Sequence, residues 1–323
     1  MASEELPQPN KLPLVVVAGP TGSGKSALAI ALAQKFQGEI VNYDSLQLYR
    51  GFDIGTAKTP FGERHGIPHH LFDVLEPANG YSAGEYARAG RAVLREISGR
   101  GRLPILAGGT GFYLKALLEG LPVLPERDQS LRGRLSAREG HKPGALHRLL
   151  TRLDPDAAAR IHKNDSQKLT RALEIRLTTG APLPLRETAA PLEDYAPVKI
   201  GLNPDRTALN ARLDARVEAM FGEGLLHGGL IEEVRELLAK GATGDEKPFD
   251  ALGYRQALAF IRERLSLEEA IESTQWETRQ YAKRQLTWFR RDPEMRWLAG
   301  FGDSSWVQAD AAETVRLAAL PSS

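Results

Sequence analysis

One octapeptide constrains this chain more than any other feature. Residues 19–26 read GPTGSGKS and match the phosphate-binding pattern G-x-x-x-x-G-K-[ST] at every fixed position. They follow an apolar, β-branched run at residues 12–18 (LPLVVVA) and precede an alanine-rich helical pattern at residues 26–36. A strand, a glycine-rich turn and a helix N-terminus in this order surround phosphate oxygens with backbone N–H groups, and the hydroxyl of the last residue can hold Mg²⁺. We therefore predict a phosphate or diphosphate site, its ligand left open by the motif, at Gly19, Pro20, Thr21, Gly22, Ser23, Gly24, Lys25 and Ser26.

Strand and helix patterns alternate after this motif. Short apolar runs at residues 39–43 and 103–107 are typical of buried strands, and a helical pattern covers residues 82–98 between them. The second run leads into GGTGFY, residues 108–113, and a further helix that ends near Glu119. Strands that alternate with helices pair in parallel and are covered on both faces, so the sequence predicts an α/β fold, a P-loop NTPase-like parallel sheet flanked by helices.

The pattern changes in the middle of the chain. Residues 129–179 show helical patterns alone, a proline-rich stretch follows at 181–197, and residues 198–202 (VKIGL) resemble a strand that returns to the sheet. We therefore expect an all-helical domain inserted at residues 126–197 within an α/β core, which consists of residues 1–125 and 198–323 and has a helical C-terminal part.

Composition narrows the class of protein. The chain has 323 residues, 42% of them hydrophobic and 26% charged, which is enough for a large buried core and a soluble surface. It contains no cysteine, so disulfides, thiolate nucleophiles and cysteine-built zinc sites are excluded. The polar, acidic start MASEELPQPNK is unlike a secretory or transit signal, and no apolar run could span a membrane. We expect a cytoplasmic protein.

Positive charge is segregated along a nearly neutral chain. The net charge is +1, but residues 127–176 contain twelve Lys and Arg against six Asp and Glu, and residues 279–296 contain six against two. The second segment and the residues before it interleave cations with aromatic side chains: Trp276, Arg279, Tyr281, Lys283, Arg284 and Trp288. Such clusters suit a polyanion such as nucleic acid, but from charge alone a solvated helix face with an aromatic core stripe explains them equally well.

Asp44 is the strongest candidate for acid–base chemistry. It follows the strand expected at residues 39–43, at the carboxyl edge where open parallel sheets bind ligands. A carboxylate there can act as a general base or as a metal partner, whereas an aspartate of a turn or helix N-cap is the structural alternative. No other apolar strand ends in an aspartate in the manner of a Walker-B strand, which argues against an ordinary ATPase.

Two further motifs each have a structural alternative. Gly108, Gly109 and Thr110 follow a strand, so they are expected at the same edge as the phosphate loop, although a strand-to-helix turn also needs glycine. His69 and His70 suggest a metal site, but no second ligand pair stands at metal spacing. We expect packing or turn roles for these histidines.

These motifs together resemble the bacterial tRNA dimethylallyltransferases. The resemblance extends over residues 12–298, in the order and spacing of that family. It rests on GPTGSGKS, DSLQLYRGFDIGTAK, IPHHLFD, YSAGEYAR, ILAGGTGFYLKALLEGL, ARIHKNDSQKLTRALEI, ALGYRQ and TRQYAKRQLTWFRR. Only the first of these segments is generic to phosphate-binding proteins.

The resemblance implies a Mg²⁺-assisted transfer of a dimethylallyl group from its diphosphate to N6 of the adenosine next to the anticodon (position 37) of tRNA. Asp44 matches the family's general base, Ser26 its hydroxyl near the metal and diphosphate, and Arg216 its arginine that neutralises the leaving group. The phosphate loop would hold the prenyl donor. The family's tRNA-contacting segments match Asp44, Ser45, Leu46, Gln47, Thr110, Gln167, Lys168, Leu169, Thr170, Arg171, Asp250, Ala251, Leu252, Gly253, Tyr254 and Arg255.

The chain departs from the family pattern at a few positions. Thr59 separates Lys58 from Pro60, and Asn42 and Tyr43 precede Asp44 where small or apolar residues are commoner. Three alternatives stay open: a small-molecule kinase, an isopentenyltransferase acting on free adenine nucleotides, and an RNA-binding protein with a regulatory nucleotide site. No heptad seam is visible, so we expect a monomer.

Overall fold

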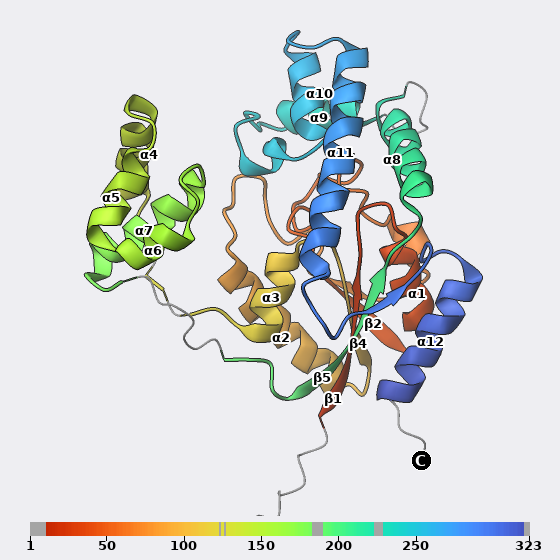
Figure 1. Cartoon of the computed structure of the whole chain (residues 1–323). Helices are drawn as coiled ribbons and strands as arrows, with labels where there is room; N and C mark the ends of the chain where they lie inside the picture. Colours follow the sequence, from red (N-terminus) through yellow and green to blue (C-terminus); the bar gives the residue numbers. More distant parts are fainter. Residues whose placement is uncertain (1–10, 123, 126, 183–189, 223–228, 320–323) are drawn as a thin grey trace, which may run out of the picture. The chain divides into compact units, whose positions relative to one another are not determined.

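Residues 11–122, 124–125, 127–182, 190–222 and 229–319 are described by the computed structural model of this chain (Figure 1). The chain divides into a core unit, Met1–Leu118 with Pro191–Ser323, and an insertion unit, Glu119–Ala190. Both boundaries fall a few residues before the insertion expected at 126–197. Part of the proline-rich stretch, residues 183–189, lies outside the described residues.

In the described part of the core unit, six parallel strands form one sheet, which confirms the expected α/β fold. Their order is β3 (His69–His70), β2 (Gly38–Asn42), β4 (Leu103–Ala107), β1 (Leu12–Ala18), β5 (Tyr195–Leu202) and β6 (Arg296–Leu298). The expectation that β5 begins at residue 198 was wrong, because Tyr195, Ala196 and Pro197 already pair with β1. Proline is tolerated there because it lies near the start of the strand.

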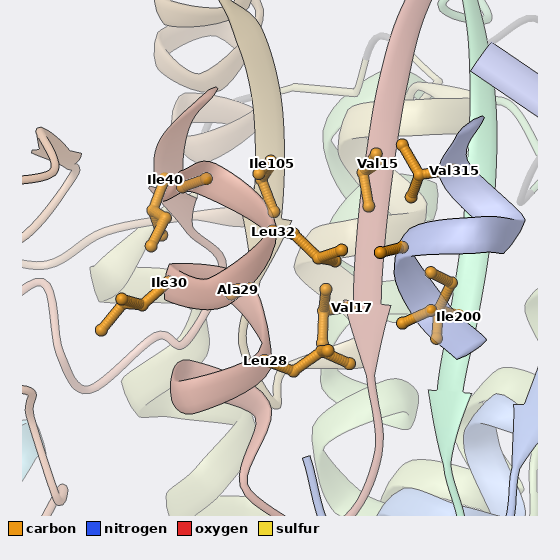
Figure 2. Packing of buried hydrophobic residues seen from close by; sticks show 14 of the residues in the cluster. Val15, Val17, Leu28, Ala29, Ile30, Leu32, Ile40, Ile105, Ile200 and Val315 are labelled. Atoms are coloured by element: carbon orange, nitrogen blue, oxygen red, sulfur yellow. The ribbon is translucent and has the colours of Figure 1, made fainter. Parts of the chain in front are cut away.

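Helices cover both faces of this sheet. α1 (Lys25–Phe36) and α12 (Ser305–Ala319) pack on one face, and α2 (Ala83–Gly99), with α3 (Gly111–Glu119) beside it, covers the other (Figure 1). Successive strand residues point to opposite faces, so Val15 and Val17 of β1 share a core cluster with Leu28 and Leu32 of α1 (Figure 2). The phosphate loop between β1 and α1 is therefore held at both ends by buried structure.

The parallel arrangement brings the sequence motifs to one edge of the sheet. β2, β4 and β1 are neighbours, so the segments that follow them lie side by side: Asp44, Gly108–Thr110 and the phosphate loop. The segment after β6 reaches the same edge, where Gly302 N donates to Ser23 O at 2.8 Å. Motifs that are far apart in the sequence thus share one site.

The C-terminal helices of the core unit anchor the loop that begins at Asp44. These are α8 (Arg206–Phe221), α9 (Leu230–Ala239), α10 (Tyr254–Ile261) and α11 (Leu267–Phe289), with the 3-10 helix η2 (Lys247–Asp250). Phe52 of the loop is buried against Phe249 and Tyr254, with ring centroids 5.1 and 4.8 Å away. Glu233 accepts the Tyr254 O–H at 2.5 Å and two backbone N–H groups of the loop. A second 3-10 helix, η1 (Phe61–Arg64), follows this loop.

The insertion unit is helical, as its sequence pattern predicts. It contains α4 (Gln129–His141), α5 (Ala145–Leu153), α6 (Pro155–Arg160) and α7 (Ser166–Thr179). Their apolar faces meet in a small core that includes Leu146, Leu150, Leu169 and Leu173. Within the parts of the chain that the structure describes, no helix is long and apolar enough to cross a bilayer.

Candidate active site

The phosphate loop forms the N-terminus of α1. Gly24 precedes the helix with a φ of 85°, a left-handed conformation in which a side chain would be strained, and a Cβ there would lie 2.8 Å from Gly302 N. Lys25 Nζ donates to Pro20 O at 2.9 Å, so the loop curls around its own lysine. Ser26 is exposed in the same helical turn. The ammonium group and the first N–H groups of α1 lie at one helix end, which favours an anion.

Asp44 is held at the end of β2 by a buried neighbour. Asn42 Oδ1 accepts Asp44 N–H at 2.7 Å, and Asn42 Nδ2 donates to Asp44 O at 3.0 Å. The Asp44 carboxylate in turn accepts the N–H of Leu46 at 3.0 Å. In the sequence Asn42 was visible only as a departure from the family pattern; the structure shows that it fixes the backbone of the candidate base.

Gly108 and Gly109 allow the chain after β4 to pass directly against Asp44. A Cβ at Gly108 would lie 2.7 Å from Asp44 N, and one at Gly109 would lie 3.2 Å from Asp44 Oδ2. Thr110 Oγ1 accepts the Ser45 N–H at 3.0 Å and donates to Ser45 Oγ at 3.2 Å. These glycines are therefore required for close approach, and Thr110 lies beside the candidate base as expected from its position after the strand.

Arg216 reaches the phosphate loop from α8. Its Nη2 donates to Thr21 Oγ1 at 2.9 Å, whereas its buried Nε has no hydrogen-bond partner among the described residues. Arg212, one turn earlier, donates to both carboxylate oxygens of Asp303, at 3.1 and 2.8 Å, and so ties α8 to the segment after β6. A buried cationic donor without a partner is available for an oxyanion bound in the loop.

The charges at this edge perturb one another. Burial lowers the pKa of Lys25 to about 8, against the opposing effect of the Asp44 carboxylate, and the Arg216 charge adds to the decrease. Burial raises the pKa of Asp44, although the Leu46 N–H and Lys25 oppose the increase. Burial also lowers the pKa of Arg216 to about 10. The carboxylate is thereby a stronger base, and the two cations lie where negative charge can be neutralised.

Residues of α11 complete this edge. Gln285, which no sequence pattern singled out, contacts both the phosphate loop and Gly109. Burial and the Asp44 charge raise the pKa of Tyr281, one helical turn before it. The Trp288 ring lies over the backbone of Gly111, where a Cβ would come within 2.1 Å of it. In the sequence, Gln285 is visible only as a glutamine within a basic helix. Its burial, which sets it apart from its neighbours, cannot be read from residue type.

The expected tRNA-contacting segments differ in how far they can meet a ligand. In the core unit, Asp44, Ser45, Leu46, Gln47 and Thr110 lie together at the sheet edge and are partly exposed. In residues 250–255, Asp250 and Arg255 are exposed, whereas Gly253 and Tyr254 are buried. Arg255 pairs with Glu277. The buried members are therefore not available for direct contact with a ligand, whereas their exposed neighbours are.

The insertion-unit segment is divided in the same way. Gln167 and Lys168 are exposed on α7, whereas Leu169 and Thr170 are buried in the core of the unit. Arg171 donates to Glu174 at 2.6 Å and to Pro125 O at 2.8 Å. Glu174 is fully buried and also pairs with Arg132, at 3.2 Å. The guanidinium of Arg171 therefore stabilises the buried Glu174 carboxylate within the insertion unit.

This arrangement predicts unequal losses of stability for substitutions of two neighbouring cations. Arg171→Ala is expected to lower the free energy of unfolding of the insertion unit by about 2 kcal/mol, because the buried Glu174 carboxylate loses a charged hydrogen bond. Lys168→Ala removes a pair with Asp165 whose lysine is 72% exposed and should cost about 0.5 kcal/mol or less. Denaturant unfolding of the full-length variants measures both. If Arg171→Ala lowered the free energy of unfolding as little as Lys168→Ala, Arg171 would not be a structural residue.

His69 and His70 take the structural roles expected of them. His70 Nε2 lies 2.7 Å from Glu39 Oε2, and Arg100 donates to the same oxygen at 2.7 Å. His69 Nδ1 contacts Ile67 O at 2.8 Å. Across the described ranges, no group of three or more His, Asp or Glu side chains could hold a metal ion.

A phosphate-binding loop, a carboxylate and a buried guanidinium meet at one edge of a parallel sheet, which defines a P-loop α/β protein equipped for chemistry on a phosphorylated ligand. A family model described as IPP transferase matches residues 47–292. The chain belongs to this enzyme family, and the resemblance stated from the sequence is confirmed.

Relatives and solved structures agree with this assignment. The chain is 56% identical over 306 residues to a tRNA dimethylallyltransferase of Solibacter usitatus, covering 94% of this chain and 98% of that protein. It is 50% identical over 307 residues to one of Koribacter versatilis, with the same coverage. The tRNA isopentenylpyrophosphate transferase of Bacillus halodurans superimposes with a TM-score of 0.68 at 35% identity, over 95% and 98% of the two chains. The structure of a eukaryotic dimethylallyltransferase acting on tRNA superimposes with a TM-score of 0.78 at 29% identity, covering 94% of this chain and 78% of that chain.

Proposed function

We propose that this protein transfers the dimethylallyl group of dimethylallyl diphosphate to N6 of the adenosine next to the anticodon in tRNA, yielding N6-isopentenyladenosine. The names of its relatives support tRNA prenylation. The observation that carries the residue assignment is that Asp44 and Lys25 lie close enough at the sheet edge to shift each other's pKa, while Arg216 binds Thr21 of the phosphate loop. A base and a cationic anion site are the two groups that this reaction needs.

The chemistry accounts for the residue types. The lone pair of an exocyclic adenine amine is delocalised into the ring, so the amine is a poor nucleophile. Asp44 takes the N6 proton as the bond from N6 to the allylic carbon forms and the carbon–oxygen bond of the donor breaks. The bonding electrons leave with the diphosphate, whose charge is neutralised by Lys25, Arg216 and the N-terminal N–H groups of α1.

Mg²⁺ fits this donor set. The ion prefers oxygen ligands and is commonly bound through one protein group, several waters and substrate phosphates. Ser26 presents an exposed hydroxyl in the first turn of α1, next to the proposed diphosphate position. Ser26 and the diphosphate oxygens would hold the ion, which supplies further neutralisation of the leaving group.

Exposed cations suit the tRNA acceptor. A hollow on the surface of α11 is lined by Lys283, Arg284, Trp288 and Arg291, which combine phosphate contacts with a stacking surface. The insertion unit exposes Lys168 and further basic side chains. The target base must leave its stack to reach Asp44. We propose a monomer that acts in the cytoplasm and binds tRNA with strong salt dependence.

One assay tests the proposal. The purified protein is incubated with labelled dimethylallyl diphosphate, Mg²⁺ and unmodified tRNA, with AMP and ATP as competing acceptors. We expect label in tRNA at the adenosine next to the anticodon. Label in AMP would instead indicate an enzyme of free nucleotides, and phosphate transfer from ATP without any prenylation would indicate a kinase.

The pKa shifts predict a bell-shaped pH profile. The active free enzyme has Asp44 ionised and Lys25 protonated, so kcat/KM for the donor should fall at low pH through the raised pKa of Asp44. It should fall again at high pH through the pKa of Lys25, near pH 8. Lys25→Arg keeps its charge and should move the alkaline limb to higher pH. An unchanged alkaline limb in that variant would exclude Lys25 as its cause.

A further inference from the structure

Gln285 joins the two halves of the candidate site. It lies in the basic helix α11, yet it is only 5% exposed. Its Oε1 accepts the N–H of Thr21 in the phosphate loop at 2.7 Å, and its Nε2 donates to Gly109 O at 3.0 Å. Gly109 in turn lies against Asp44. One side-chain amide thus spans from the loop for the phosphate to the segment that supports the base.

The residue type matches this position closely. Thr21 offers a donor and Gly109 an acceptor, so the bridging group must accept at one end and donate at the other, as a neutral amide does. Glycine at 109 makes the contact possible, because a Cβ there would lie 2.3 Å from Gln285 Nε2. Thr21 carries a second bond, from Arg216 to its Oγ1, so Gln285 also supports the residue that orients this guanidinium.

We propose that Gln285 is a positioning residue. It sets the separation between the phosphate loop, which would hold the diphosphate, and the segment of Asp44 and Gly109, where the acceptor adenosine would react. This inference rests on the proposed prenyl transfer. Gln285 bonds backbone groups of Thr21 and Gly109 and the side chain of Tyr281, so it acts on the reaction through these neighbours. Transfer between two bound substrates requires the amine and the allylic carbon to meet at near-contact distance, and a displacement of about 1 Å can cost about 10²-fold in rate.

Two variants separate positioning from binding and from folding. Gln285→Met keeps the length of the side chain but removes its hydrogen bonds, and Gln285→Glu keeps an acceptor for Thr21 while losing the donor to Gly109. Gln275→Met is the matched control: it lies on the same helix, and its Nε2 donates to Asp214 O at 3.3 Å and Glu218 Oε1 at 3.0 Å. The readouts are the single-turnover rate constant with saturating enzyme and donor, the Kd for tRNA, and the Tm.

We expect Gln285→Met to lower the single-turnover rate constant by about 10²-fold and Gln285→Glu by about tenfold, with the Kd for tRNA within about twofold of the wild type. Gln275→Met should leave the rate constant within about twofold. The rate constant does not depend on the fraction of folded protein, so a lower Tm alone does not reproduce this result. A rate constant near the wild-type value in Gln285→Met, or a loss confined to tRNA affinity, would overturn the proposal. Absence of tRNA prenylation by the wild type would instead refute the proposed function.

Discussion

Asp44→Ala is expected to lower kcat for tRNA prenylation by about 10³-fold, the scale of a lost general base, while the Kd for tRNA stays within a fewfold of the wild-type value. Without the carboxylate, the N6 proton has no acceptor as the new bond forms. The loss should appear in kcat because the base acts on the transition state. Single-turnover kinetics and filter binding measure the two quantities separately.

Two controls distinguish a base from a structural carboxylate. Asp44→Asn keeps the size of the side chain and an oxygen that can accept the Leu46 N–H, so the fold of the loop should survive while the activity is lost. Asp245→Asn alters an exposed aspartate and should leave kcat unchanged. If Asp44→Asn retained most of the activity, or if Asp44→Ala failed to bind tRNA, Asp44 would be a contact residue and not the base.

Arg216→Ala is expected to lower kcat by about 10²-fold, the cost of removing a preorganised charged donor from a developing oxyanion. The diphosphate gains negative charge as the carbon–oxygen bond breaks, so the guanidinium is worth more in the transition state than in the bound donor. The KM for the donor should therefore change much less than kcat. Steady-state kinetics at saturating tRNA checks this ratio.

The geometry of Arg216 also predicts the result of a conservative change. Arg216→Lys retains a charge, but an ammonium cannot reproduce the fork in which Nη2 binds Thr21 and Nε stays free, so only part of the activity should return. Arg206→Ala, an exposed arginine on the same helix, is the control and should behave like the wild type. If Arg216→Ala instead raised the KM for the donor by as much as kcat is expected to fall, and left kcat unchanged, Arg216 would be assigned to donor binding alone.

Local patterns were sufficient for the elements that surround the phosphate loop. β1 and β4 begin and end at the predicted residues, and α1 begins one residue before its predicted start. Apolar β-branched runs and helical spacing report burial along a short segment, and a continuous apolar run is typical of a parallel strand that is buried on both faces. β5 was mispredicted at its start because the prolines suggested a loop, whereas pairing with β1 decided its conformation.

The residue pattern alone established the chemistry available at each strand end: a phosphate loop, Asp44 after β2 and Gly108–Thr110 after β4. Arg216 was indicated by the family resemblance, but its bond to Thr21 and the bridge made by Gln285 depend on tertiary packing, because both residues come from helices that lie far along the chain. Tertiary packing also decided which cations bond buried carboxylates, so that Lys168 makes only a surface pair with Asp165 while Arg171 binds the buried Glu174. Composition and spacing record which side chains are present. Which of them meet is decided by the packing of elements that are distant in the sequence.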